Sequence, residues 1–425
     1  MRFSWILVTL LGVMGAASPA SAGGFDTPIL YSARHIGMGG TAVATVDDAS
    51  AGFHNPAGFG AIGKANVIAN FSPIIGSLRS SPNMYTGGPD AGQPLNVTSD
   101  NTFAPFFLLG GAVRVWDYLS FGATIFPVAS AGATYNYSTD PTNPEGSAVR
   151  DYTKLVFLEI APGFAFNYDA WGLRLGMTWR INTVALDRER SGASPLDLHV
   201  GGVSLAGIRV GAQWDVPWVE GLSFGLHYRS KVRINADKSS ASSALGLDLA
   251  EANQDWTLPS RLSFGASHKI GTMRVSADAE YGFQSQNERG DISVVVASGG
   301  EVTLPNVYAW KNQWTLRGGI EYGVYEDRIP VRVGFIWDQR TSNPSYASAF
   351  GAPPAANYAL TAGTGYRVDG HRVNFAAVYR WGKGEATAAQ IASPNPDYGA
   401  CNFCAFAGTY VIKMAGLYLD YSYDF

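Results

Sequence analysis

Apolar and polar residues alternate one by one along most of the chain. In Trp171–Ile181, one face carries Trp, Leu, Leu, Met, Trp and Ile, and the other carries Gly, Arg, Gly, Thr and Arg. A period of two predicts β-strands whose two faces meet different surroundings. The stretches Leu222–Tyr228 and Val331–Trp337 repeat the pattern. Trp at both ends of an apolar face is typical of a strand that crosses a membrane.

Fourteen such segments can be traced, and short and long connections alternate between them. An even strand number with short turns at one end and long loops at the other is typical of a bacterial outer-membrane barrel. We therefore predict an all-β fold, a 14-stranded antiparallel transmembrane β-barrel. The predicted spans are 65–76, 102–116, 118–130, 153–168, 171–187, 199–214, 221–235, 258–269, 272–287, 309–323, 329–341, 356–367, 370–383 and 409–425.

The first residues predict export. Arg2, a short apolar run and the small residues Ala20-Ser21-Ala22 form a secretory signal peptide over residues 1–22. Only 15% of the residues are charged and the formal net charge is −4, which argues against a nucleic-acid partner. These features predict a monomer in the bacterial outer membrane, with both termini in the periplasm.

Small residues and turn formers precede the first strand in "DDASAGFHNPAGFG", Asp47–Gly60. Because this segment lies between the signal peptide and the barrel, we expect it to fold inside the lumen. We predict an N-terminal hatch (plug) over residues 23–63 and the barrel over 64–425. The expected hatch residues are Asp47, Asp48, Asn55, Pro56 and Ala57.

Two prolines fall within predicted neighbouring strands, Pro105 in the second and Pro127 in the third. Proline cannot donate to a β-ladder, and a barrel in lipid tolerates no unpaired backbone. Counting from the turn between the strands places the prolines almost level. They mark either a local opening in the wall or a harmless break above the bilayer.

Apolar residues near these prolines and in one long loop are candidate substrate contacts. They are Phe106, Leu108 and Phe126, with Leu245 and Leu247 in the loop predicted over 236–257. The loop patch is either a landing surface for an apolar ligand or ordinary loop packing. Inward-facing positions also carry arginine and carboxylate residues of both signs, which favours a salt-bridged wall over a charged pore.

Motifs that resemble catalytic or metal sites do not fit their surroundings. "GLSFG" matches the esterase nucleophile motif, but it lies within a strand and not on a strand-to-helix turn. The six histidines show no metal-ligand spacing. Cys401 and Cys404 in "CNFC" are expected to form a local disulfide in an exported chain, because a zinc site needs further ligands and a redox motif needs a βαβ unit.

The segment "ARHIGMGGTAVATVDDASAGFHNPAGF", Ala33–Phe59, resembles the amino-terminal plug of the outer-membrane long-chain fatty-acid transporter family (FadL/TodX, OMPP1). "DWTLPSRLSFGASHKI", Asp255–Ile270, is similar to a second stretch of that family. The resemblance implies capture by outer loops and an inward kink in the third strand that opens the wall. Gly122 and Pro127 are the kink candidates, and the loop over 188–198 is shorter than the family's capture loop. Terminal Phe425 resembles the signal read by the barrel assembly machinery.

These observations predict passive transport of hydrophobic compounds, either long-chain fatty acids or aromatic hydrocarbons. The ligand would be captured by loops, bind in an apolar lumen pocket and leave sideways near Pro105, Gly122 and Pro127. We expect no catalysis, no cofactor and no metal, and contact with outer-membrane lipid and lipopolysaccharide. The alternative is a plugged barrel that serves as a shuttle or docking partner in secretion. A plug argues against a polar-solute porin.

Overall fold

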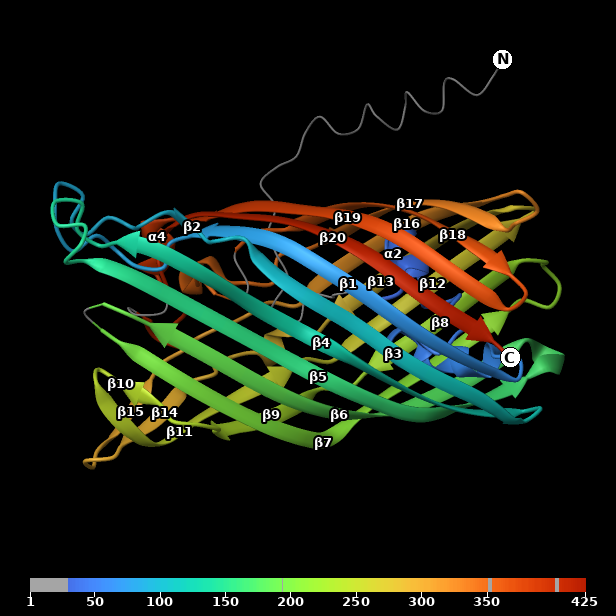
Figure 1. The fold of residues 1–425 in the computed structure, drawn as a ribbon, viewed down its shortest axis with the longest axis horizontal. Helices are drawn as coiled ribbons and strands as arrows, with labels where there is room; N and C mark the ends of the chain where they lie inside the picture. The colour runs from blue at the N-terminus through green and yellow to red at the C-terminus, as the bar shows by residue number, and fades with distance from the viewer. Residues whose placement is uncertain (1–29, 193, 351–353, 402–404) are drawn as a thin grey trace, which may run out of the picture.

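The computed structural model describes residues 30–192, 194–350, 354–401 and 405–425. Within them the chain forms the predicted 14-stranded antiparallel barrel, in which the last strand pairs with the first (Figure 1). The signal peptide and the first residues of the predicted hatch lie outside the described residues. No helix in the described part of the chain is both long enough and apolar enough to cross a bilayer.

Most positions in the barrel are filled by one continuous strand. These are β1 (Ala65–Ser80), β3 (Thr102–Trp116), β4 (Leu119–Ser138), β5 (Ala148–Tyr168), β6 (Leu173–Arg190), β7 (Leu196–Asp215), β13 (Met273–Gly282), β16 (Gln313–Val324), β17 (Ile329–Asp338), β18 (Asn357–Val368), β19 (His371–Ala386) and β20 (Gly408–Asp424).

Two positions are each filled by two strands with a short break between them. They are β8 (Leu222–Arg229) with β9 (Val232–Lys238), and β12 (Arg261–Ile270) with β11 (Leu247–Leu258). Short strands extend the sheet at the loop end: β2 (Val97–Thr98), β10 (Ser243–Ala244), β14 (Ile292–Val296) and β15 (Glu301–Leu304). The helical turns outside the hatch are η2 (Asp169–Trp171), η3 (Gln284–Gln286), η4 (Pro344–Tyr346) and α4 (Ala388–Ile391).

Short turns gather at one end of the barrel, together with the C-terminus (Figure 1). A two-residue turn joins β18 and β19 through Asp369 and Gly370, with φ of 47° and 82°. Two residues with positive φ suit the right-handed twist of the flanking strands. We call this end the periplasmic end and the end with the long loops the outer end.

Several strands run further into the outer end than the sequence predicts. β4 continues to Ser138, and the loop predicted over 236–257 is a hairpin of β10 and β11. Outward residues such as Asp248, Glu251 and Asp255 are exposed and polar there. The apolar outward face that located the strands in the sequence is therefore absent from these extensions.

The hatch lies inside the barrel toward the periplasmic end (Figure 1). Its described residues contain α2 (Ala33–Gly37), α3 (Ala51–His54) and η1 (Pro56–Ala61), and most of their side chains are buried. Each helix is too short to be stable alone, so contacts with the wall must hold the hatch in shape.

Candidate functional site

Asn55 connects the hatch to the wall. Its side-chain oxygen accepts a hydrogen bond from the backbone N–H of Ala57 (3.1 Å) at the start of η1. Pro56 suits this first helical position, where no N–H is needed. The amide nitrogen of Asn55 lies 3.0 Å from the carbonyl oxygen of Ala212 in β7 and 3.3 Å from that of Leu226 in β8. The Asn-Pro-Ala turn therefore caps its own helix and contacts two neighbouring strands.

The two predicted hatch aspartates have different contacts. Asp47 accepts a hydrogen bond from Arg34 Nη2 (3.2 Å) and forms an ion pair with Arg372 of β19 (3.3 Å). Asp48 accepts a hydrogen bond from the backbone N–H of Ser50 (2.9 Å) within the hatch. Asp47 thus links the hatch to the wall, and Asp48 shapes a turn of the hatch.

Inward-facing glycines let the hatch backbone approach the wall directly. A Cβ atom on Gly176 would overlap Pro56, and one on Gly211 would overlap the side-chain oxygen of Asn55. An added Cβ would also overlap hatch atoms at several other wall glycines, including Gly110 and the four named next. We call six of these glycines the glycine ring: Gly176, Gly211, Gly225, Gly265, Gly319 and Gly334.

The wall is interrupted between β3 and β4. The two strands pair from their short turn up to Leu109 and Ile125. Beyond this pair β3 continues with β1 and β4 continues with β5, but no β3–β4 pair is present among the described residues. The segments meet again where the N–H of Asp100 donates to the carbonyl of Thr134 (2.8 Å). We call this interval the window: Thr102–Leu108 on β3 and Phe126–Ala133 on β4.

A β-bulge accompanies the departure of β4 from β3. The register of β4 against β5 shifts between Pro127 and Ala129, which leaves Val128 as an extra residue. Bulges bend a strand and interrupt its ladder. All residues over 126–129 are buried, although β4 alternates between exposed and buried positions below them. This part of β4 therefore bends into the lumen.

The predicted opening residues fall in different places. Pro127 lies in the inward-bent part of β4, and Pro105 lies across the window, opposite Pro73 of β1. Extending the β3–β4 register would place Pro127 opposite Phe107, so the two prolines are offset by two residues. Gly122 lies below the window, and the ring of hatch Phe59 fills the space of its missing side chain. Gly122 is thus a hatch contact and does not border the window.

Hatch residues hold the inward bend of β4. The hydroxyl of Tyr31 donates to the carbonyl oxygen of Pro127 at 2.5 Å. The Phe53 ring contacts the Phe126 ring with 5.0 Å between centroids. The Arg209 guanidinium lies 5.4 Å from the Phe126 ring and donates to the carbonyl of Phe53 (2.8 Å). We call Tyr31, Phe53, Phe126 and Arg209 the window cluster.

Three of the predicted substrate contacts line the lumen beside the window. Phe106 is 7% exposed, and Leu108 and Phe126 are fully buried. They belong to one apolar cluster that runs from the hatch to the outer lumen, where the rings of Phe157 and Trp256 meet at 5.8 Å. The lumen is therefore not filled by ion pairs alone.

The other two predicted contacts do not join this lining. Leu245 and Leu247 are 68% and 51% exposed, at the turn between β10 and β11. The expected landing surface therefore lies apart from Phe106, Leu108 and Phe126. The cause is the outward extension of the strands, which carries this turn away from the lumen.

The sequence reasoning missed Phe157, Trp256 and the hatch residue Tyr31. One signal was present for Phe157, because "LVFL", Leu155–Leu158, is apolar on both faces of a strand. A membrane strand of this kind faces lipid on one side and an apolar lumen on the other. No comparable local signal marks Tyr31.

Three glutamates on the inner wall each bind two arginines. Glu159 lies 2.8 Å from both Arg180 and Arg209. Glu280 pairs in the same way with Arg261 and Arg317, and Glu321 with Arg332 and Arg367. Buried charges need such partners, and the arrangement fits a salt-bridged wall.

A cavity of about 40 Å³ remains between this wall and the hatch, next to Phe53 and Val128.

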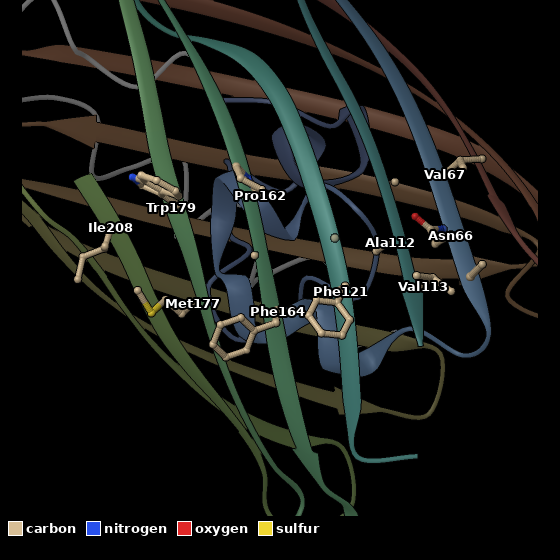
Figure 2. A pocket seen from close by; sticks show the side chains of 14 residues that line it. Asn66, Val67, Ala112, Val113, Phe121, Pro162, Phe164, Met177, Trp179 and Ile208 are labelled. Atoms are coloured by element: carbon tan, nitrogen blue, oxygen red, sulfur yellow. The ribbon is translucent and has the colours of Figure 1, made fainter. Parts of the chain in front are cut away.

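A groove lies on the outer surface of the barrel just below the window (Figure 2). It has a volume of about 880 Å³ and is mostly apolar. Gly111 and Pro162 are part of its lining, and Ala123 is paired between them. Its lining also includes Val67, Val113, Phe121, Phe164, Met177, Trp179 and Ile208. We call it the outer groove.

The outer groove and the window share a border. Leu109 and Ile125, the last paired residues below the window, lie two positions along their strands from Gly111 and Ala123. Leu109 is 48% exposed on the outer surface. The side chains of Leu109 and Ile125, which lie between the window and the groove, are both apolar.

Two buried histidines are part of the hatch. The rings of His35 and His54 lie 4.8 Å apart. Burial, followed by the charge of Arg34, lowers the pKa of His35 to about 4, and burial also lowers the pKa of His54 well below its ordinary value. Both are neutral at pH 7.

No group of three or more His, Cys, Asp or Glu able to hold a metal ion occurs in the part of the chain that is described. Cys404 lies outside the described residues, so its pairing with Cys401 stays a prediction.

Known structures share this architecture. A Pseudomonas aeruginosa FadL homologue aligns with a TM-score of 0.72 and 18% identity over 96% of this chain and 100% of its own. The Pseudomonas putida toluene transporter TodX aligns with a TM-score of 0.67 and 16% identity over 96% and 100% of the two chains. The Ralstonia pickettii toluene transporter TbuX gives 0.65 and 18% over 94% and 99%. At these identities the likeness establishes the fold. A search of curated proteins gave no match.

A sequence profile of one family covers nearly the whole chain. The profile is described as outer membrane protein transport protein (OMPP1/FadL/TodX) and matches residues 13–425. This family consists of transport channels and not of enzymes. The chain belongs to the OMPP1/FadL/TodX family of outer-membrane transporters of hydrophobic compounds, and it is a bacterial outer-membrane β-barrel.

Proposed function

We propose that this protein carries hydrophobic compounds passively across the outer membrane and releases them sideways through the window. The compounds are long-chain fatty acids or aromatic hydrocarbons. They are captured at the outer loops, bind along the apolar lining of the lumen and leave between β3 and β4. The observation that carries the proposal is the missing β3–β4 pairing beside the buried ring of Phe126.

The hatch supports a sideways route. The glycine ring holds the hatch backbone against the wall around much of the barrel, and Asn55 binds two strands. A ligand that continued along the barrel axis would have to displace these contacts. The window requires no such displacement, because β4 is already bent away from β3.

The outer groove supports release into the membrane. An apolar ligand that moves from the lumen through the window into the groove stays in contact with apolar surface. Burial of apolar surface favours each bound position by about 25 cal/mol per Å² relative to water. Because the groove faces lipid, the final step into the bilayer exposes no apolar area to water.

Deletion of Val128 tests the proposal. Removing the extra residue restores the β4 register and lets β4 continue its ladder with β3. We expect uptake of radiolabelled oleate or toluene to fall at least about tenfold, in cells that lack other transporters. Ligand bound by the purified protein, measured by extraction and mass spectrometry, should persist.

A matched control removes the extra residue from a bulge elsewhere. Ala250 fills this role, because the register of β11 against β14 shifts between Leu249 and Glu251 at the outer end. Deletion of Ala250 should leave uptake unchanged. If deletion of Val128 also leaves uptake unchanged in a folded barrel, the window is not the exit. Purified protein without any bound hydrophobic compound would instead favour the docking alternative.

A further inference from the structure

The outward face of β18, β19, β20 and β1 carries three cations close to an aromatic belt. Trp337, Tyr358, Trp381 and Lys413 lie in one row across neighbouring strands. Lys383 and Arg79 lie in the next row toward the outer end, on either side of Val411. All three cations are exposed. Aromatic rows mark the interfaces of a membrane barrel, so the cations lie at the level of lipid headgroups.

The aromatic residues at the periplasmic end support this placement of the cations at the level of lipid headgroups. Tyr421 and Tyr423 face outward near the periplasmic end, and Tyr421 pairs with Val373. Trp381 lies eight residues further along β19. At about 3.3 Å per residue and a tilt of about 40°, this separation is about 20 Å. It is close to the apolar band of about 25 Å in barrels of this type, which places Lys383, Lys413 and Arg79 in the outer leaflet.

An apolar groove runs beside two of these cations. It has a volume of about 470 Å³ and opens on the lipid-facing surface between β18, β19 and β20. Leu360, Tyr379 and Val411 provide apolar surface, and Lys383 and Lys413 lie on the same lining. We call it the β19–β20 groove. An apolar channel with cations beside it suits a lipid with an anionic headgroup.

The three cations have no carboxylate partner. Among the described residues, Arg79, Lys383 and Lys413 take part in no ion pair within 4.0 Å. Glu385 lies two residues beyond Lys383 and is the acidic residue on this face of β19. Against three cations, its one negative charge leaves the patch with a net positive charge.

Two outward cations of β5 at the outer end face acids. Arg150 of β5 forms an ion pair with Glu189 of β6 at 3.0 Å, and Lys154 lies opposite Asp187 in register. The three cations near the β19–β20 groove differ in this respect from these two cations of β5.

We propose that the β19–β20 groove binds the phosphorylated glycolipid of the outer leaflet, the lipid A part of lipopolysaccharide. An acyl chain lies along Leu360 and Tyr379, and the phosphates contact Lys383, Lys413 and Arg79. These cations extend across three strands, about 10 Å at the usual strand spacing. A headgroup with two phosphates spans that width better than the single phosphate of a phospholipid. The site is separate from the window and does not depend on the transport proposal.

Native mass spectrometry of the detergent-solubilised protein tests the site. The probe is bisphosphorylated, hexa-acyl lipid A, titrated against the wild type and the triple variant Arg79→Gln, Lys383→Gln and Lys413→Gln. One basic residue near an anionic lipid surface contributes about fivefold to affinity. We therefore expect the triple variant to bind about 100-fold more weakly.

The matched control is Arg150→Gln with Lys154→Gln, which removes outward cations that already face acids. It should bind lipid A as the wild type does. Retention of heat-modifiable migration on gels shows that a variant is folded. If the triple variant does not fold, Lys413→Gln alone should weaken binding about fivefold.

Three outcomes would overturn the proposal. The first is equal affinity of the folded triple variant and the wild type. The second is equally tight binding of fully dephosphorylated lipid A, which would show that acyl chains alone are recognised. The third is equally tight binding of phosphatidylglycerol, which would show a general site for anionic lipids.

Discussion

At the scale of residues, one hydrogen bond joins the hatch to the opening in the wall. Tyr31 donates to the carbonyl of Pro127, in the part of β4 that no longer pairs with β3 but still pairs with β5. A buried carbonyl without a partner costs about 1–3 kcal/mol. The hydroxyl therefore stabilises the bent form of β4, and the hatch takes part in holding that bend.

Replacing Tyr31 with Phe tests this role. The substitution keeps the aromatic contacts with Phe53 and Phe126 but removes the donor. We expect the bent form of β4 to lose about 1–3 kcal/mol, and amide hydrogen exchange over residues 124–132 to accelerate about tenfold or more.

Tyr135→Phe is the control for this substitution. Tyr135 is also fully buried and donates to the carbonyl of Ala349 (3.0 Å), but it lies at the outer end. Loss of the Tyr135 hydroxyl should leave amide hydrogen exchange over residues 124–132 unchanged. If Tyr31→Phe leaves the exchange unchanged too, the hydroxyl does not hold the bend.

At the scale of elements, the hatch backbone rests against glycines of the wall, and wall side chains such as Asp278 and Thr361 hydrogen-bond to it. Short helices such as α2 and α3 cannot persist alone, and the glycine ring provides flat patches of wall against which they rest. A wall side chain at these positions would push the hatch toward the lumen axis. The ring therefore fixes the position of the hatch.

Gly225→Ala tests the ring. The added methyl group would overlap the carbonyl oxygen of Val43 in the hatch. Overpacking of this kind costs about 1–3 kcal/mol, so we expect a loosened hatch in a barrel that still folds. Single-channel recordings in planar bilayers should show more frequent openings.

Gly318→Ala provides the matched control. Gly318 faces outward, and no atom lies within 4 Å of its missing Cβ. The channel recordings should match those of the wild type. Identical recordings for Gly225→Ala and Gly318→Ala would show that the hatch tolerates displacement and that the ring does not hold it.

The elements were predictable to different degrees. The alternation of apolar and polar residues located the barrel strands within the membrane, because lipid imposes an apolar outward face. It did not locate the extensions β10 and β11, whose outward residues are polar. The sequence therefore predicts a loop at Leu245 and Leu247, either a landing surface or ordinary loop packing, whereas they lie at the turn of the β10–β11 hairpin.

At the scale of the whole molecule, the prolines predicted a weak point in the wall but not its geometry. The bulge at Val128 depends on the register of β4 against β5, which no local pattern encodes. The contact of Tyr31 with Pro127 joins positions 96 residues apart. Such contacts form only when the barrel has closed around the hatch, so a single sequence does not show them.

In the proposed function, the barrel, hatch, window and outer groove form one route. An apolar cluster lines the lumen from the outer end to Phe126, the hatch lies toward the periplasmic end, and the wall is interrupted beside Phe126. Hydrophobic molecules gain from a route of this kind because they leave for the bilayer without crossing water.

Photo-crosslinking from the outer groove tests this route most directly. Ala123 lies between Gly111 and Pro162 in register, and Ala277 is an exposed, outward-facing alanine on β13, away from the window. Each would be replaced by a benzophenone amino acid in outer-membrane vesicles, and crosslinks to radiolabelled oleate would be followed over the first seconds after its addition. Lateral release predicts that the crosslink at Ala123 forms several-fold earlier than that at Ala277, and that deletion of Val128 abolishes the difference. Equal and simultaneous crosslinking at both positions would contradict release through the window.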